Sequence, residues 1–380
     1  MTYMKNKSKT KIAIISAKKP ALESGSEGRN YYLSNGLAKK FSVKVYLPTL
    51  RASEKKLDLL HRVKLIVSGK IPYIEILKKA QFKEKDLSQL KNIDIVQIQE
   101  MSGYYMFEKY LDGVKGKIVL DTHNIDYLRF LSETESKNIV ERYLGRLLSI
   151  KLKRMELKAL QKFDHILVCS QLEKDYYSKH IDSNKITVIP NGADYKTFNA
   201  SKRPMDNTIL FMGLLSYQPN IEGLKYYIEQ IHPKVLSKIP NAQLMILGKD
   251  APEWLKNAAI NDPTIKLVGF VKDVREYLKK AKVCICPILS GSGTRLKILE
   301  YMAMGKPVVS TSIGAEGIMV KNKHNILLAD NSNLFSENIV TVLLDKKLSE
   351  KLGRNARRVI KKNYMWDTII EKLQKLYDNI

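Results

Sequence analysis

Short runs of β-branched and aliphatic residues alternate with longer amphipathic stretches throughout this chain, and the series starts twice. Alternation of this kind predicts parallel strands with helices on both faces of the sheet. We expect the first series of strands at 12–16, 43–47, 93–98, 117–121, 165–169 and 185–192, and the second at 208–213, 242–248, 265–270, 283–287 and 307–310. The chain is therefore expected to be an α/β protein built from two doubly wound, Rossmann-like domains.

A length of 380 residues suits two domains of ordinary size. The boundary is expected near 199–206, where Ser201-Lys202-Arg203-Pro204 is typical of a linker. We predict an N-terminal domain over 1–198, a C-terminal domain over 199–362, and a final helix over 363–380 that crosses back to the first domain. Further helices are expected at 30–40, 74–89, 138–163, 347–361 and 364–379.

The formal net charge is +26, which favours anionic partners such as nucleic acid, an acidic lipid surface or a phosphorylated substrate. Aromatic residues do not interleave with arginines along any predicted strand, so no nucleic-acid partner is expected. The helix predicted over 138–163 is basic on one face and apolar on the other. The pattern favours packing of its apolar face on the sheet, and contact with an anionic membrane surface is the alternative.

The three cysteines, Cys169, Cys284 and Cys286, lie in apolar, strand-like runs. Buried cysteines that stay reduced indicate a cytoplasmic protein, and no apolar run approaches the length of a membrane span. We therefore expect a cytoplasmic location, with any membrane contact at the inner face. No pair of cysteines has zinc-ligand spacing and no Asp-x-Asp motif follows a strand, so no metal and no other cofactor is expected.

The run 290–310 predicts a loop of small residues, then a helix, then a buried strand. A loop made of Gly291, Ser292, Gly293 and Thr294 leaves backbone N–H groups unshielded before the positive end of a helix dipole, which favours a bound phosphate. Arg295 and Lys297 are expected in the first helical turn, where cations weaken a helix unless an anion lies nearby. A plain glycine-capped helix is the alternative interpretation.

Glu300 follows within the same predicted helix, beside an apolar stripe. A carboxylate in such a place is costly unless a ligand donates hydrogen bonds to it, and a ribose diol would do so. Gly213, Gly248 and Gly269 end three predicted strands of the same domain. Because parallel strands end at one edge, these glycines are expected at the edge where α/β sheets bind ligands.

In the first domain, the connection after the first strand is long and contains Gly25, Ser26, Gly28 and Arg29. Glycines there allow close backbone approach to a ligand, although the spacing is not that of a dinucleotide fingerprint, and a solvent-exposed loop is the alternative. His123 follows the strand at 117–121 with carboxylates on both sides, so a neutral imidazole there could bind a sugar hydroxyl or orient an acceptor, and a structural histidine with its hydrogen bonds satisfied is the alternative.

The order of these motifs, most closely over 190–317, resembles the retaining glycosyltransferases of the GT-B fold, in sequence family 4. The resemblance implies two domains that face a central cleft, with Asn191 and Gly192 lining it. It implies a catalytic role for His123, Arg295 and Lys297, and places the loop of Gly25, Ser26, Gly28 and Arg29 near the diphosphate or the acceptor. The implied donor-binding residues are Gly213, Gly248, Lys249, Phe270, Val271, Gly291, Ser292, Gly293, Thr294 and Glu300.

The chain departs from the family pattern at two places. Many relatives carry an arginine and a lysine in the loop that here spans 213–220, where this sequence has neither. The family also has a glutamate eight positions before Glu300, and this chain has Ser292. Neutralisation of the phosphates is therefore expected from Arg295 and Lys297, and part of sugar recognition from the amides of the loop.

The resemblance implies a metal-independent, retaining glycosyltransferase of hexosyltransferase type. It would move a sugar from a nucleotide-diphosphate sugar, a UDP- or GDP-sugar, to a glycan or lipid-linked acceptor in polysaccharide biosynthesis. The alternatives are a GT-B UDP-sugar epimerase and a non-catalytic basic protein that binds sugar nucleotides or nucleic acid.

Overall fold

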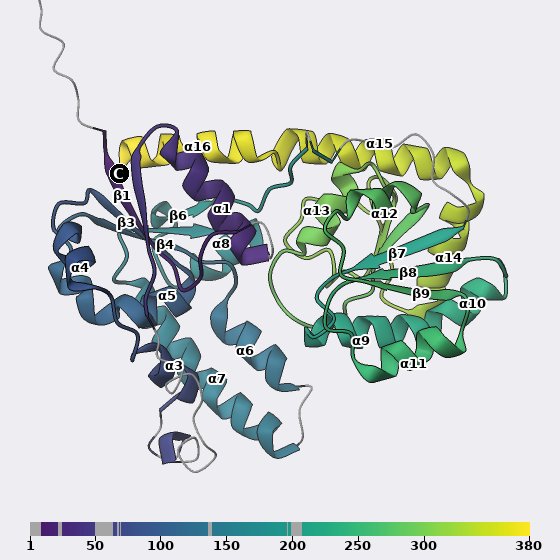
Figure 1. The fold of residues 1–380 in the computed structure, drawn as a ribbon, viewed down its shortest axis with the longest axis horizontal. Coiled ribbons are helices and arrows are strands. Elements are labelled where there is room, and N and C mark those ends of the chain that lie inside the picture. The colour runs from purple at the N-terminus through teal and green to yellow at the C-terminus, as the bar shows by residue number, and fades with distance from the viewer. Residues whose placement is uncertain are drawn as a thin grey trace, which may run out of the picture. The chain divides into compact units, whose positions relative to one another are not determined.

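The computed structural model describes residues 9–21, 25–49, 64–66, 68, 70–135, 139–195, 197–198 and 207–380. It divides into two compact units, one of Met1–Pro190 with Ile369–Ile380 and one of Asn191–Thr368 (Figure 1). The division falls between Pro190 and Asn191, eight residues before the predicted domain boundary, and the predicted linker over 199–206 lies outside the described residues.

The first unit contains a parallel six-stranded sheet of order β2-β1-β3-β4-β5-β6. Its strands are β1 Lys11–Ile15, β2 Ser42–Tyr46, β3 Ile95–Gln99, β4 Lys117–Asp121, β5 His165–Val168 and β6 Ile186–Val188. Each lies within a few residues of a predicted strand. Their side chains are mostly buried, as expected for a sheet that is covered on both faces.

The helices of the first unit are α1 Gly25–Ala38, α3 Pro72–Leu77, α4 Glu84–Leu90, α5 Glu100–Phe107, α6 Asp126–Glu135, α7 Ile139–Leu160 and α8 Gln171–Tyr177. The single helix predicted over 74–89 is wrong, because the structure has α3 and α4 with a break between them. At the break the backbone of Gln81 pairs with Thr49 in an antiparallel bridge, and that pairing is incompatible with a continuous helix.

The long helix α7 packs on α6 through a face that includes Gly145, Ser149, Leu152 and Glu156. Glu156 accepts hydrogen bonds from the backbone N–H groups of Asp126 and Tyr127 and so caps α6. The N-terminal half of α7 runs away from the sheet, below it in Figure 1. The expectation that the apolar face of this helix packs on the sheet therefore fails over that half, where several apolar side chains are exposed.

The second unit contains a parallel six-stranded sheet of order β12-β11-β10-β7-β8-β9. Its strands are β7 Thr208–Met212, β8 Gln243–Leu247, β9 Ile265–Gly269, β10 Val283–Cys286, β11 Val308–Ser310 and β12 Leu327–Leu328. The strand order reverses between β7 and β10. In open α/β sheets such a switch point opens a crevice at the carboxyl ends of the strands, here the loops after Met212 and Cys286.

The helices of the second unit are α9 Gln218–Tyr226, α10 His232–Leu236, α11 Glu253–Asn261, α12 Arg275–Lys280, α13 Leu296–Ala303, α14 Ser332–Leu344 and α15 Lys346–Asn363. The last helix, α16 Trp366–Asn379, begins in this unit, and its residues from Ile369 onward belong to the first. There Gln374 donates to the carbonyl of Gly36, and the Tyr377 hydroxyl donates to Gln97. None of the described helices is long and apolar enough to cross a membrane.

Candidate functional site

The loop between β10 and α13 holds backbone donors that nothing in the described chain uses. Gly291 and Gly293 have φ values of 95° and 86°, which favour glycine because a side chain would be strained there. Among the described residues, no backbone N–H group from Gly291 to Lys297 donates a hydrogen bond. A row of backbone donors without partners at a helix N-terminus is suited to an anionic ligand.

Three side chains of the same loop also carry buried polar atoms without partners in the described structure: Ser292 Oγ, Thr294 Oγ1 and Arg295 Nε. Arg295 lies before α13 rather than in its first turn, which corrects the sequence expectation. Its terminal nitrogens donate to the carbonyls of Ser290, Ser292 and Gly293 and so hold the loop in shape. Its buried Nε has no partner among the described residues and is available to a ligand.

Lys297 brings a cation to the loop that follows β7. Its Nζ donates to Asn220 Oδ1 at 2.7 Å and lies 4.1 Å from the ring centre of Phe211. A Cβ on Gly213 would lie only 2.7 Å from the same nitrogen. Lys297 therefore places its charge beside the loop whose sequence lacks both family cations. Burial lowers the pKa of Lys297 to about 8.

Glu300 lies one turn further along α13 and is half-buried. Within the described residues its carboxylate has no hydrogen bond and no ion pair. Burial raises the pKa of Glu300 to about 7, an effect that the charge of Lys297 opposes. A carboxylate held in this way is an open acceptor for hydroxyl groups of a ligand.

The ends of neighbouring strands form the rest of this edge. A Cβ on Gly248 would lie 1.9 Å from the carbonyl of Gly213, so the close approach of these two strand ends requires glycine. The backbone N–H of Leu215 donates to the carbonyl of Lys249. Beyond β9, Phe270 is 70% exposed and Val271 is half-buried. An exposed aromatic ring beside a strand end can stack on a planar ligand group.

Sequence reasoning missed the contribution of α9 to this edge. Glu222 accepts from Ser290 Oγ at 2.9 Å and from Gln218, and so ties the glycine-rich loop to α9. Pro219 and the Tyr217 hydroxyl lie against Gly291. Pro219 in the first turn of α9 indicates where this helix begins, but it does not indicate that Glu222 reaches the glycine-rich loop.

In the first unit, Arg29 on α1 and Asp121 at the end of β4 form a buried ion pair. The Arg29 Nη2 atom lies 2.6 Å from Asp121 Oδ1, and the two side chains are 1% and 0% exposed. Arg29 also donates to the carbonyl of Pro190. The guanidinium holds the pKa of Asp121 near 2 against the cost of burial. This arrangement gives Arg29 an interior partner and does not support a ligand contact for it.

His123 lies beside this pair and between two carboxylates. Its Nδ1 is 2.8 Å from Glu100 Oε1, and its Nε2 is 3.8 Å from Asp121 Oδ2 and 3.3 Å from Gln99 Oε1. Although burial alone would lower the pKa of His123, the two carboxylates raise it to about 9. The imidazole is therefore charged near neutral pH, which corrects the expectation of a neutral ring.

Glu100 is the first residue of α5 and has a φ of 59°. A residue other than glycine rarely adopts this conformation, so the surrounding structure holds the carboxylate against backbone strain. Asn30 Oδ1 and Gln99 Nε2 are buried close by without partners among the described residues. This edge of the first sheet therefore combines a charged imidazole with unsatisfied hydrogen-bonding groups.

The other predicted residues are less informative. The predicted loop of Gly25, Ser26, Gly28 and Arg29 is wrong, because α1 begins at Gly25 and these residues form its first turns. A Cβ on Gly28 would meet no atom within 4 Å. Asn191 is buried, and Gly192 lies against the indole of Trp366. The latter contact gives Gly192 a packing role inside the second unit.

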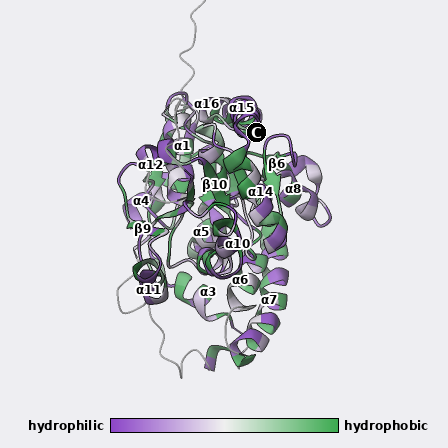
Figure 2. Cartoon of the chain, turned by 90° about the vertical axis from the view of Figure 1, so that its right-hand side faces the viewer, coloured by the Kyte–Doolittle hydropathy of each residue, from purple (hydrophilic) through white to green (hydrophobic). Residues whose placement is uncertain are grey.

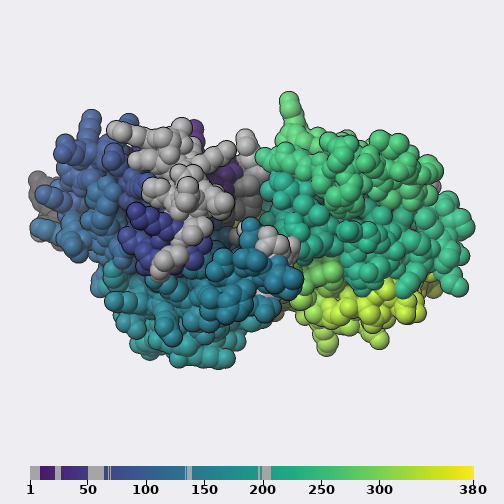
Figure 3. All heavy atoms as spheres, turned by 90° about the horizontal axis from the view of Figure 1, so that it is seen from below, coloured from purple at the N-terminus to yellow at the C-terminus, as the bar shows by residue number. Residues whose placement is uncertain are grey.

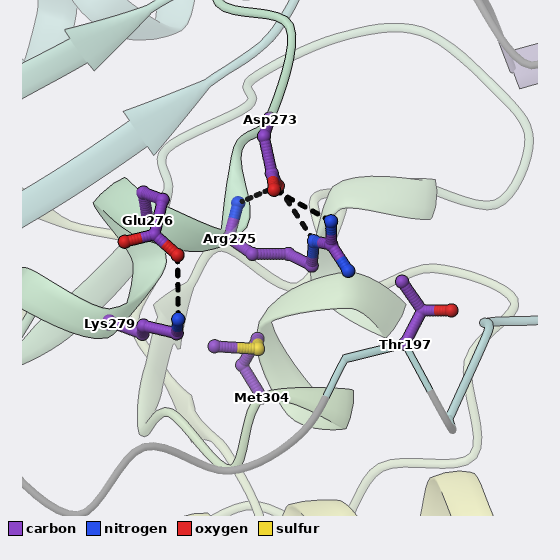
Figure 4. Close-up of a pocket in the computed structure, with 6 residues that line it drawn as sticks. All are labelled: Thr197, Asp273, Arg275, Glu276, Lys279 and Met304. Carbon is purple, nitrogen blue, oxygen red and sulfur yellow. Dashed lines mark hydrogen bonds and ion pairs between the residues drawn. The ribbon is translucent and has the colours of Figure 1, made fainter.

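A separate pocket of about 260 Å³ lies in the second unit, lined by Thr197, Asp273, Arg275, Glu276, Lys279 and Met304 (Figure 4). Its charged groups are already paired, Arg275 with Asp273 and Lys279 with Glu276. It contains none of the predicted site residues. No group of three or more metal-ligating side chains occurs among the described residues, and the absence of a metal requirement stays a prediction.

Comparison with known families matches both halves of the chain. The family model described as Glycosyl transferases group 1 matches residues 206–345, and that described as Glycosyltransferase Family 4 matches residues 24–197. The first match contains the glycine-rich loop and α13, and the second contains Arg29 and His123.

Individual proteins agree with these matches. A Klebsiella pneumoniae protein described as an uncharacterized 44.6 kDa protein in the cps region is 25% identical over 77% of this chain and 76% of its own length. The Escherichia coli UDP-Gal:alpha-D-GlcNAc-diphosphoundecaprenol alpha-1,3-galactosyltransferase is 27% identical, over 60% of this chain and 64% of its own length.

The fold also has solved counterparts. The structure of a sucrose-phosphate synthase from Thermosynechococcus elongatus superposes with a TM-score of 0.73 at 19% identity, over 97% of this chain and 98% of that one. The two parallel six-stranded sheets are those of the GT-B fold, as the motif order predicted. The chain thus belongs to the family 4, or group 1, glycosyltransferases.

Proposed function

We propose that this glycosyltransferase is a retaining enzyme that takes its sugar from a nucleotide-diphosphate sugar bound at the carboxyl edge of the second sheet. The observation that carries the proposal is the loop before α13. It presents a row of unpaired backbone donors, with Lys297 on one side and the unpaired carboxylate of Glu300 behind.

In this proposal the loop and Lys297 bind the diphosphate. As the bond between sugar and phosphate breaks, negative charge grows on the departing phosphate. The amides of Gly291 to Lys297, the dipole of α13 and the Lys297 ammonium are already in place to meet that charge, and such preorganisation is the largest source of catalysis in many enzymes. Arg295 holds the loop and adds its Nε.

Glu300 would accept hydrogen bonds from the two ribose hydroxyls, and Phe270 would pack on the base. The charged His123 would hold the transferred sugar, a role that the family resemblance implies for it. No side chain needs to act as a covalent nucleophile, in keeping with a reaction on a single face of the sugar. We expect the reaction to be independent of metal, because Lys297 and the loop supply the stabilising charge.

We infer a UDP-sugar donor and a lipid-linked or glycan acceptor. The support is the E. coli relative, whose name specifies UDP-galactose and a diphosphoundecaprenol-linked acceptor. A lipid-linked acceptor would place the enzyme at the inner face of the cytoplasmic membrane, in polysaccharide assembly.

A thermal-shift panel of UDP, GDP, ADP, dTDP and CMP tests the donor site. Ligands that bind the folded state raise the melting temperature, so the matching diphosphate should stabilise the wild-type chain but not Glu300→Ala. A matched control is Glu337→Ala, which removes an exposed carboxylate on a different helix, α14, and should keep the response. A chain that responds to none of these nucleotides would overturn the proposal.

A sugar-nucleotide-binding protein without transfer activity is a second candidate. The specific observation in its favour is Ser292, which stands where many relatives carry a glutamate that contacts the sugar. Release of the diphosphate from a donor sugar in the presence of membrane lipid extract separates the two. Nucleotide binding with no release under any acceptor would favour the second candidate.

A further inference from the structure

The N-terminal half of α7 carries five large apolar side chains that the fold leaves exposed. They are Ile139, Val140, Tyr143, Leu147 and Ile150, with exposed fractions of 75%, 68%, 65%, 50% and 54%. Spacings of three and four residues place Tyr143, Leu147 and Ile150 on one side of the helix. We call these five residues the α7 stripe.

The opposite side of the helix already has its partner. A Cβ on Gly145 would lie 2.4 Å from Thr134 Oγ1, so α7 and α6 are in close contact there. Ser149, Leu152 and Glu156 continue this buried side. The α7 stripe is therefore not a misplaced part of the core, since the core-facing side of the same helix is filled. Figure 2 shows green and purple residues alternating along this part of α7, and Figure 3 shows α6 and α7 in teal on the surface toward the viewer.

Basic residues surround the α7 stripe. Arg142, Arg146, Lys151, Lys153 and Arg154 follow within the same helix, and no acidic residue occurs between Glu141 and Glu156. Lys151, Arg154 and Lys158 continue the exposed side of α7 beyond Ile150. The exposed side is thus apolar over its first turns and cationic over the next.

This combination selects one kind of partner. An interfacial helix buries its apolar residues among lipid acyl chains while its lysines and arginines contact anionic headgroups, and tyrosine is favoured at that boundary. A second copy of the chain would bring two cationic surfaces together, and like charges in contact oppose association. The net charge of +26 further favours an anionic surface.

We propose that the α7 stripe docks this enzyme on an anionic lipid bilayer. The side chains of Tyr143, Leu147 and Ile150 enter the headgroup region, and Lys151 and Arg154 contact the headgroups. The proposal deepens the proposed function, because its purpose rests on a lipid-linked acceptor, but the surface itself does not depend on the donor site.

Co-sedimentation of the full chain with lipid vesicles tests the docking. We expect the wild type to bind vesicles of phosphatidylcholine with one third phosphatidylglycerol, and to bind pure phosphatidylcholine weakly. The double variant Leu147→Ser with Ile150→Ser should bind the anionic vesicles about tenfold or more weakly. Lys151→Gln with Arg154→Gln should also weaken binding about tenfold, and its remaining binding should depend less on salt.

The matched control is Ile260→Ser with Leu344→Ser, which removes two apolar side chains that are 78% and 71% exposed on other helices. This control should bind vesicles like the wild type. Leu147→Trp gives a second readout, since its fluorescence should shift to the blue on anionic vesicles only. The substituted positions all lie at the surface, so every variant should melt close to the wild-type temperature. They are Leu147, Ile150, Lys151, Arg154, Ile260 and Leu344.

Equal vesicle binding by the wild type and the Leu147→Ser, Ile150→Ser variant would overturn the proposal. So would a wild type that ignores anionic vesicles, or a dimer in solution that this variant dissociates. The nucleotide shift is measured on the same variants. Loss of vesicle binding with an unchanged shift supports the docking, and vesicle binding by a chain that ignores every nucleotide supports the docking while it overturns the proposed function.

Discussion

The carboxyl edges of the two sheets carry similar residues in opposite states. In the first unit, Arg29, Asp121, His123 and Glu100 neutralise one another at distances of 2.6 to 3.8 Å. In the second unit, Lys297 and Glu300 have no oppositely charged partner within ion-pair distance among the described residues. The buried pair of Arg29 and Asp121 stabilises the fold, whereas the open charges and amides of the second unit are available to a ligand.

The pKa directions express the same difference. Partners in the first unit lower the pKa of Asp121 and Glu100 to about 2 and raise that of His123 to about 9, so all three stay charged. In the second unit burial dominates and moves Lys297 to about 8 and Glu300 to about 7. Without a bound ligand, Lys297 and Glu300 each have a pKa close to neutral pH, so a small change of pH removes the charge of either group.

Lys297→Met tests whether the open cation acts on the departing phosphate. We expect turnover to fall by about a thousandfold, because a preorganised charge is lost from the transition state. Steady-state kinetics with donor and acceptor measure the change. Lys306→Met is the matched control, since Lys306 is also buried but donates to the carbonyls of Lys279 and Ala281. Equal losses in both variants would mean that Lys297 acts only through stability.

Arg29→Met tests the paired charges of the first unit. Removal of one member of a buried ion pair leaves the other uncompensated, which should lower the free energy of unfolding by about 3–5 kcal/mol. Arg29→Met with Asp121→Leu should recover most of this loss. Urea unfolding measures both. Full stability in Arg29→Met would show that solvent, rather than Asp121, satisfies the guanidinium.

The same pair has a pH signature. The folded pKa of Asp121 lies near 2, below an unfolded value of about 3.9. The ionised Asp121 carboxylate therefore stabilises the fold fully above its unfolded pKa, and this stabilisation is lost as the pH falls through its folded pKa. The acid side of the stability curve should be shallower in the double variant than in the wild type.

Nucleotide affinity should be highest between about pH 7 and 8. Above that window Lys297 loses its proton, and below it Glu300 gains one and stops accepting ribose hydroxyls. Glu300→Gln should weaken diphosphate binding about ten- to a hundredfold at pH 7.5. It should also remove the acid limb of the profile, as measured by calorimetry. An acid limb that persists in Glu300→Gln would assign the titration to another group.

Strands β1 to β11 could be predicted from the sequence because parallel strands buried on both faces appear as continuous apolar runs, whereas β12 was missed because it has only two residues, Leu327 and Leu328. The break between α3 and α4 could not, because it depends on the pairing of Gln81 with Thr49, 32 positions away. The exposure of the N-terminal half of α7 was missed for a related reason. Its periodicity is that of a packed helix, and only the tertiary structure shows which side meets α6.

Site residues divide in the same way. Gly291, Gly293 and Glu300 could be singled out because their local pattern implies a loop, a helix and a carboxylate in an apolar setting. The partners of Arg29 and Arg295 could not be predicted, since a guanidinium can serve a ligand or the fold equally well. Glu222 reaches the loop from α9, and nothing near it in the sequence indicates this.

Glu100→Gln probes how tightly the first unit holds its charges. With the carboxylate gone, the pKa of His123 should fall from about 9 toward its ordinary 6.5, because the remaining partner Asp121 is shared with Arg29. Because its folded pKa is raised, protonated His123 stabilises the fold fully below its unfolded pKa, and this stabilisation is lost as the pH rises through its folded pKa. In the variant the folded pKa is lower, so the stabilisation should be lost at a lower pH. Nuclear magnetic resonance of the imidazole measures the pKa directly.

Glu100→Gly separates charge from backbone strain, since it also removes the carboxylate but accepts the φ of 59° without cost. A lowered pKa in both variants would show that the Glu100 carboxylate sets the charge of His123, whereas a pKa that stays near 9 in either would assign that charge to Asp121 alone.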